Sequence, residues 1–355
     1  MPKTPIKPAT ISDVARSAGL SRTTVSTALS GNGRLSEETR ELVRHHAALL
    51  GYEPDFFAQN LRRKRNDLIG FFSPDLDLGV STHKTQLIWQ LLNERGYTVP
   101  ILAYGDRAGG QSKHQEELFA DLRRQKPRAI LCNSLNLQSP RAHDELHRYL
   151  DEGGIAVCFD WPLPDESEKP RCDSVIFDRE ENTYTATRHL LELGHREIGL
   201  CLPQSQISGG PRLRGFRRAM AEFDAPVEAR WIHAPVPDIE TEREGARLAQ
   251  WFFDLKAKPS ALCVVGDPVC AAFVTQLLRA GWKLPDQLSL VSHDNRAIAE
   301  LGMLPLTSVS YPIEEIAQSV VEILDARLRG DQSPPRRHIV RGQIWVRQSA
   351  RAFQG

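Results

Sequence analysis

The segment 22–30 places hydroxyl groups on one helical face and an apolar stripe on the other. The apolar stripe consists of Val25, Ala28 and Leu29. The opposite side and the first turn carry Arg22, Thr23, Ser26, Thr27 and Ser30. Hydroxyl and guanidinium groups on one face can form hydrogen bonds to a polar surface, but a helix this short is not stable alone in water. The segment therefore predicts a recognition surface that other helices hold in place.

A second short helix is predicted just before it, over 11–18, with its own apolar stripe of Ile11, Val14, Ala15 and Ala18. Thr10 and Ser21 are predicted to cap the two helices, and Asp13 follows Thr10 at the spacing of a capping box. Gly19 suits a left-handed turn between them. Two helices joined in this way are typical of the helix-turn-helix, whose second helix lies in the DNA major groove. An ordinary helical hairpin is the alternative for this stretch alone.

A third helix is predicted over 36–51, with His46 as a packed structural residue on its apolar side.

The first part of the chain is basic and the rest is acidic. Residues 1–66 carry eleven Lys and Arg against six Asp and Glu, a net charge of +5. Because the whole chain has a net charge of zero, the remaining residues carry −5. This asymmetry indicates a small head that binds a polyanion and a body that does not.

The composition is that of an ordinary globular protein. The chain has 355 residues, 41% of them hydrophobic and 25% charged, which predicts two or three folded units. Six cysteines without a C-x-x-C pair are expected to be buried free thiols rather than metal ligands or disulfides. With no apolar signal segment and no apolar run of about 18 residues, we expect a cytoplasmic protein without a membrane span.

From residue 68 onward, apolar strands alternate with amphipathic helices, which predicts parallel sheets covered on both faces. The Pro-rich segment 161–170 is predicted to separate two lobes. The first lobe is expected at about 67–160 and 312–338, and the second at about 163–309 and 339–355. Ligands of open α/β sheets bind outside the carboxyl ends of the strands, so the cleft between the lobes is the expected site.

The segment 54–66 links the head, expected at 1–53, to the core, expected at 67–355. It allows about two helical turns and contains the basic run Arg62-Arg63-Lys64-Arg65. Because so short a helix is unstable in isolation, it is predicted to be ordered only when something packs against it.

The sequence resembles the LacI/GalR family of transcriptional regulators over essentially its whole length. The resemblance rests on "ATISDVARSAGLSRTTVSTALSGNGRLSEETRELVRHHAALLGYEPDFFAQNLR" in the head and on "IGFFSPD", "RHLLELGHREIGLC", "RLRGFRRAM", "LLRAGWKLPDQLSLVSHDN" and "LPLTSVSYP" in the body. It implies an α/β protein with a three-helix helix-turn-helix head, a hinge helix and a two-lobed core like the periplasmic sugar-binding proteins. It also implies a homodimer on palindromic operator DNA.

The resemblance implies roles for residues of the head and hinge. Arg22, Thr23 and Thr27 fall where the family's recognition helix reaches base edges, although many members have Arg or His in place of Thr27. Thr24, Ser26 and Asn32 are expected to contact phosphates. Leu61 occupies the position of a wedge that enters the minor groove and kinks the duplex, and burial against the core is the alternative. The expected DNA-binding set is completed by Thr10, Ser21, Tyr52, Ala58, Gln59 and Arg62.

The resemblance likewise implies an effector site in the cleft. Arg212, Asp294 and Asp178 match residues that hold the family's ligands, and an Arg with carboxylates suits the hydroxyls of a sugar. A structural salt bridge across the cleft is the alternative. The remaining positions expected to line the site are Leu78, Val80, Ser81, Asp160, Trp161, Gly266 and Asp267.

Several of these cleft positions depart from the family pattern. Val80 and Ser81 replace a common Phe-Phe pair, and Gly266 and Arg179 each replace a frequent Asn. His293 replaces the usual aromatic residue before Asp294. Trp161 is predicted either to stack on a sugar ring or to pack at the crossover. The identity of the effector therefore does not follow from the sequence.

Enzymes are disfavoured because the sequence has no P-loop, dinucleotide fingerprint, nucleophile elbow or zinc-protease motif. A solute-binding protein would need an export signal and no basic head. We therefore expect a transcriptional repressor without cofactor or metal, whose operator affinity is set by a small molecule, a sugar or sugar derivative. The sequence leaves open whether that molecule releases or recruits DNA, and release by a sugar is the family's commoner mode.

Overall fold

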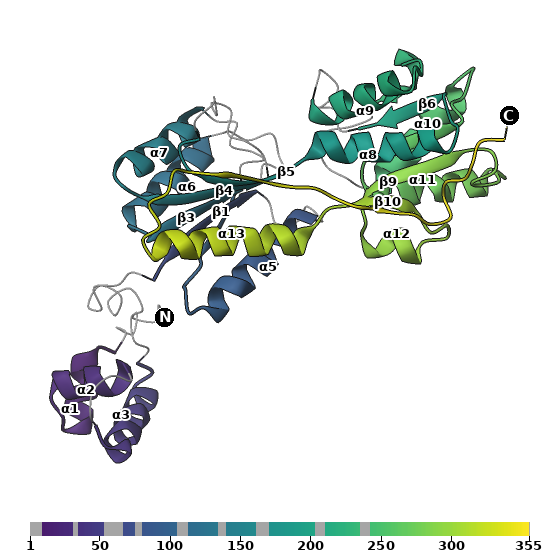
Figure 1. Cartoon of the computed structure of the whole chain (residues 1–355). Helices are drawn as coiled ribbons and strands as arrows, with labels where there is room; N and C mark the ends of the chain where they lie inside the picture. The colour runs from purple at the N-terminus through teal and green to yellow at the C-terminus, as the bar shows by residue number, and fades with distance from the viewer. Residues whose placement is uncertain are drawn as a thin grey trace. The chain divides into compact units, whose positions relative to one another are not determined.

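The computed structural model describes residues 9–30, 35–52, 67–74, 80–104, 113–133, 140–160, 170–202, 210–234 and 242–354. The chain forms two compact units, Met1–Asp67 and Leu68–Gly355 (Figure 1).

The first unit contains three short helices, α1 (Ile11–Ala18), α2 (Arg22–Ser30) and α3 (Glu37–Leu49). The backbone amide of Thr10 donates to the Asp13 carboxylate at 2.9 Å, and Gly19 ends α1 in the left-handed conformation with φ of 65°. Each predicted stripe contributes to one small core of buried residues: Val14, Ala15, Val25, Ala28, Val43 and Ala47. The three helices thus stabilise one another by burying faces that none could bury alone.

The second unit contains two parallel-stranded sheets. In the first sheet the strand order is β11-β5-β4-β3-β1-β2, and every pairing is parallel. Its strands are β1 (Ile69–Pro74), β2 (Ile101–Tyr104), β3 (Ala129–Asn133), β4 (Ile155–Asp160), β5 (Asp173–Phe177) and β11 (Arg337–Val340).

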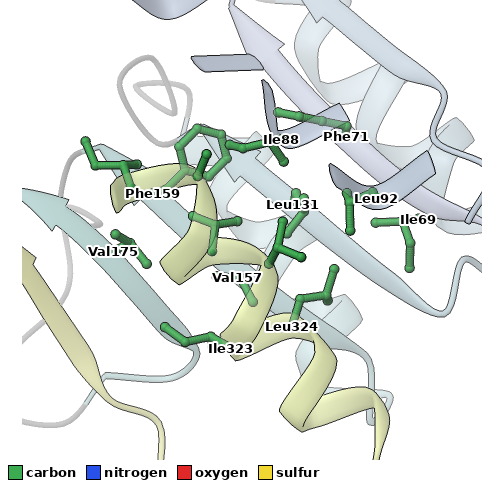
Figure 2. Packing of buried hydrophobic residues seen from close by; sticks show 14 of the residues in the cluster. Ile69, Phe71, Ile88, Leu92, Leu131, Val157, Phe159, Val175, Ile323 and Leu324 are labelled. Atoms are coloured by element: carbon green, nitrogen blue, oxygen red, sulfur yellow. The ribbon is translucent and has the colours of Figure 1, made fainter. Parts of the chain in front are cut away.

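Helices cover both faces of the first sheet. On one face, residues of α5 (Val80–Glu94) and α13 (Ile313–Leu328) join the apolar residues of the strands in one cluster. Figure 2 shows Ile323 and Leu324 of α13 lying over strand residues that include Val157. The other face packs against α6 (Lys113–Arg124) and α7 (Pro140–Asp151).

The second sheet repeats the architecture of the first, with the order β12-β10-β9-β8-β6-β7. Its strands are β6 (Ile198–Cys201), β7 (Ile232–His233), β8 (Ala261–Val264), β9 (Ser289–Asp294), β10 (Thr307–Ser310) and β12 (Ile344–Trp345). The edge strand β12 is antiparallel to β10. One face is covered by α8 (Arg179–Glu192) and α9 (Pro211–Glu222), and the other by α10 (Glu242–Asp254), α11 (Asp267–Arg279) and α12 (Ala297–Leu301).

The chain passes between the two sheets at three places: from β5 to α8, from β10 to α13 and from β11 to β12. This differs from the predicted lobe boundary, because β5 pairs with β4 in the first sheet although it follows residue 163. The Pro-rich segment connects two neighbouring strands of one sheet in sequence, so its composition marks a strand connection rather than a change of lobe. After α13 the chain is likewise divided between the two sheets, because β11 lies in the first and β12 in the second.

The six cysteines are buried free thiols, as their apolar surroundings in the sequence predicted. In the described part of the chain, no helix is long and apolar enough to span a membrane.

Candidate functional site

The polar face of α2 is the candidate DNA interface. Val25 and Ala28 are buried in the head core, and Arg22 and Thr23 are exposed on the other side of the helix. Thr27 donates its hydroxyl to the carbonyl oxygen of Thr23 at 2.9 Å, which shortens its reach from the helix. Arg22 and Thr23 therefore present the most accessible polar groups at the start of α2.

Several residues predicted for DNA binding also have structural contacts within the head. Ser21 accepts a hydrogen bond from the backbone amide of Thr24 at 3.0 Å, so it caps α2 as predicted. The hydroxyls of Ser21 and Thr24 lie 2.8 Å apart. Tyr52 packs against the head core. Ser26 is half-buried on α2. The positions Asn32, Ala58, Gln59, Leu61 and Arg62 lie outside the described residues.

In the second lobe, Arg212 near the start of α9 and Asp294 at the end of β9 are both buried. Asp294 has a positive φ of 97°, a strained conformation for a residue other than glycine. His293 Nδ1 donates to the carbonyl oxygen of Val264 at 3.3 Å. Burial, and next the nearby Arg212 guanidinium, lower the pKa of His293 to about 3, so its imidazole is neutral. A buried cation, a carboxylate and a neutral imidazole thus gather at the carboxyl edge of the second sheet.

Asp267 lies near Asp294 and accepts hydrogen bonds from three groups. Ser308 donates to its carboxylate at 2.8 Å, the backbone amide of Arg296 donates at 2.6 Å, and Ser292 donates to it as well. Burial, and next the charge of Asp294, raise the pKa of Asp267 to about 7. Because both of its oxygens accept hydrogen bonds from protein groups, Asp267 holds together β9, β10 and the segment that follows β9. Gly266, just before it, has a φ of 94°, which glycine adopts without strain.

In the first lobe, Asp160 lies at the centre of a buried polar cluster. Lys84 Nζ donates to Asp160 Oδ2 at 2.6 Å, and Tyr311 donates its hydroxyl to Asp160 Oδ1 at 2.6 Å. Arg179 donates to Asp160 Oδ1 at 2.6 Å and to the Asp160 carbonyl oxygen at 2.7 Å. Although burial opposes it, the charges of Lys84 and Arg179 hold the pKa of Asp160 well below its usual value.

The sequence predicted Asp160 at the site but missed its partners. Lys84 shares a helical stripe with Ile88 and Leu92, both fully buried. A lysine on such a stripe is the signal that could have identified it, because lysine is almost never buried without a partner. Arg179 was noted as a departure from the family pattern, without a role.

The structure describes three of the other predicted cleft positions. Asp178 accepts a hydrogen bond from the backbone amide of Glu181 at 3.0 Å and one from Arg341 Nε at 3.3 Å, so it caps α8. Val80 and Ser81 lie in the first turn of α5. Leu78 and Trp161 lie outside the described residues.

Residues 10–55 match the bacterial regulatory proteins of the LacI family, and residues 187–350 match a periplasmic binding protein-like domain. The chain is 28% identical to the transcriptional repressor PurR of Vibrio parahaemolyticus, over 97% of this chain and 99% of that protein. The chain belongs to the LacI family. It is also 28% identical to the transcriptional regulator DegA of Bacillus subtilis, over 96% of this chain and 97% of that one.

Solved structures of other transcriptional regulators have the same fold. The lac repressor dimer bound to operator and the anti-inducer ONPF superposes with a TM-score of 0.79 at 22% identity, over 98% of this chain and 100% of that one. A complex of the regulator CelR with cellobiose superposes with a TM-score of 0.68 at 25% identity, over 96% of this chain and 100% of that one. As a LacI-family member the protein is a DNA-binding transcriptional regulator with a helix-turn-helix head and an effector-binding core, and its relatives are regulators rather than enzymes.

Proposed function

We propose that this LacI-family regulator is a repressor that acts as a homodimer on palindromic operator DNA in the cytoplasm. A sugar or sugar derivative bound between the lobes sets its operator affinity. The observation that carries the proposal is the exposed polar start of α2, held in place by the packed three-helix core. Arg22, Thr23 and Thr27 would contact base edges, and Thr24, Ser26 and Asn32 would contact phosphates.

Residues 1–53 would form the DNA-binding head, 54–66 the hinge helix and 67–355 the effector-binding core. Leu61, with Ala58, Gln59 and Arg62 beside it, would enter the minor groove from each of two paired hinge helices. Two heads related by twofold symmetry require a palindromic site.

The homodimer is supported by exposed apolar side chains on the core. Leu301, the last residue of α12, is 81% exposed, and the neighbouring Met303 is 77% exposed. Apolar groups that protrude this far are typical of surfaces buried by a partner subunit. We assign the partner as a second copy of the chain, which is also the state of the lac repressor in its operator-bound structure.

The effector proposal rests on the chemistry at the carboxyl edge of the second sheet. Arg212 and Asp294 offer donors and acceptors that suit several hydroxyl groups at once. The CelR complex holds cellobiose, which is such a polyhydroxylated molecule. The effector would act by binding one lobe arrangement more tightly than another, and that arrangement would determine whether the hinge helices form.

A genomic selection with the full chain, followed by fluorescence anisotropy with the selected duplex, tests the function. The expected result is tight, palindrome-dependent binding that weakens steeply with salt, because phosphate contacts release counterions. Removal of residues 1–66 is expected to abolish it. Equal affinity for random duplex would contradict the proposal. A thermal-shift screen that begins with cellobiose and ribose would identify the effector class.

A further inference from the structure

The first lobe buries a lysine that the proposed function does not use. Lys84 is 1% exposed and lies on α5, in the stripe that packs against the first sheet. Its ammonium group donates to Asp160 Oδ2 at 2.6 Å and to the hydroxyl oxygen of Tyr311 at 2.8 Å. It also lies 5.4 Å from the centre of the Phe159 ring. A buried ammonium group is costly unless it is paired, so these contacts must hold it in the folded state.

Through Asp160, Lys84 is connected to two of the three places where the chain passes between the sheets. Arg179 begins α8 directly after the first crossover and binds both the carboxylate and the carbonyl oxygen of Asp160. Tyr311 lies in the second crossover, between β10 and α13, and donates to the same carboxylate. Asp160 itself ends β4 with a positive φ of 85°, a conformation that the surrounding contacts must maintain.

The three crossovers are also bonded to one another. Asn182 donates its side-chain amide to the carbonyl oxygen of Ser310 at 3.1 Å and accepts from the backbone amide of Gly342 at 2.9 Å. A Cβ atom on Gly342 would lie 2.0 Å from that same Ser310 oxygen, so this close approach requires glycine. The crossovers therefore form one hydrogen-bonded unit, and the contacts of Asp160 with Arg179 and Tyr311 attach that unit to the first sheet.

We propose that Lys84 is a positioning residue that fixes the joined crossovers to the first sheet through Asp160 and so selects one arrangement of the two lobes. Loss of the ammonium group leaves Asp160 without one of its two cations and removes the donor to Tyr311. The crossovers then open more often, and the balance of lobe arrangements shifts. The consequence for DNA binding rests on the proposed function, whereas the consequence for the crossovers does not.

The test compares Lys84→Met with Arg327→Met in the full chain. Methionine has nearly the length of lysine but no charge. Arg327 forms a partly buried ion pair of the same lobe, donating to both oxygens of the buried Asp173 at 2.5 and 3.0 Å, but at the opposite end of β5 from the crossover. The control therefore removes a comparable ion pair without touching the crossover unit. Tyr311→Phe is a third variant, which retains the ring next to Phe177 and removes only the hydroxyl.

Hydrogen–deuterium exchange of the protein without DNA or effector measures the opening directly. For Lys84→Met we expect exchange about tenfold faster in 178–182, 310–313 and 341–343, and for Tyr311→Phe a smaller increase of about threefold in the same segments. Arg327→Met is expected to leave these segments within about twofold of the wild type. Unchanged exchange in the crossovers, or an equal increase in Arg327→Met, would overturn the proposal.

Operator titration supplies the functional readout. Lys84→Met is expected to change effector-free operator affinity about tenfold, and Arg327→Met by less than about twofold. Faster crossover exchange with unchanged operator affinity would overturn the link to lobe selection. Faster crossover exchange in a protein that binds no operator at all would instead contradict the proposed function. If Lys84→Met does not fold, Tyr311→Phe decides the outcome by the same two measurements.

Discussion

The two lobes have the same strand order but use their buried carboxylates differently. Asp160 ends β4 in the first lobe and Asp294 ends β9 in the second, each with a positive φ. Each also has a cation on the helix after the first strand of its lobe, Lys84 on α5 and Arg212 on α9. In the first lobe the cation and the carboxylate form a buried ion pair, with Lys84 Nζ 2.6 Å from Asp160 Oδ2.

In the second lobe, the carboxylate of Asp267 accepts its hydrogen bonds from uncharged groups. Asp267 is bound by two serines and a backbone amide, and His293 beside Arg212 is neutral. The contrast indicates that the same position at a strand end serves attachment of the crossovers in one lobe and, in our proposal, effector binding in the other.

The largest expected effect is on stability. Asp160→Asn leaves two buried cations without their carboxylate and is expected to cost about 3–5 kcal/mol of unfolding free energy at pH 8. Asp267→Asn removes a carboxylate bound only by neutral donors and is expected to cost about 1–2 kcal/mol. Urea denaturation measures both, and equal losses would contradict the distinction between the lobes.

Effector affinity is expected to depend on the second lobe. Replacing Arg212 or Asp294 by Ala should remove a charge-assisted contact worth about 1.5–3 kcal/mol, a ten- to hundredfold loss of affinity. Calorimetric titration with the sugar found by the thermal-shift screen measures it. If these residues instead form a salt bridge across the cleft, the same replacements would change operator affinity in the absence of effector and leave sugar affinity intact.

Lowering the pH is expected to affect the stability of the two lobes differently. The pKa of His293 is lowered to about 3, so its stabilising contribution is present above the unfolded pKa of about 6.5 and is lost as the pH falls below it. The lowered pKa of Asp160 means that its contribution is lost only below about pH 4. His293→Phe is therefore expected to lower the unfolding free energy by about 1 kcal/mol less at pH 5.5 than at pH 8, as measured by urea denaturation. If His293→Phe changes the unfolding free energy equally at both pH values, His293 is not held neutral.

The smallest effect is expected at Asp178. Its carboxylate caps α8 and contacts the exposed Arg341, so Asp178→Ala should cost about 1 kcal/mol in urea denaturation. A loss above about 3 kcal/mol would assign Asp178 to the buried network instead.

The sequence predicted those features that depend on local pattern. The caps at Thr10 and Ser21, the turn at Gly19 and the alternation of strands and helices follow from spacing and residue type. The partners of Asp160 could not be predicted in this way, because Lys84 and Tyr311 are separated from it by 76 and 151 residues. Only the parallel sheet brings them to one edge. The membership of β5 in the first sheet is equally a matter of long-range pairing.

The most direct test of the contrast between the lobes is one operator titration, by fluorescence anisotropy without effector, of the wild type, Lys84→Met and Arg212→Ala. We expect Arg212→Ala to bind operator like the wild type, whereas Lys84→Met differs about tenfold. Wild-type affinity for Lys84→Met, together with altered affinity for Arg212→Ala, would contradict the contrast between the lobes.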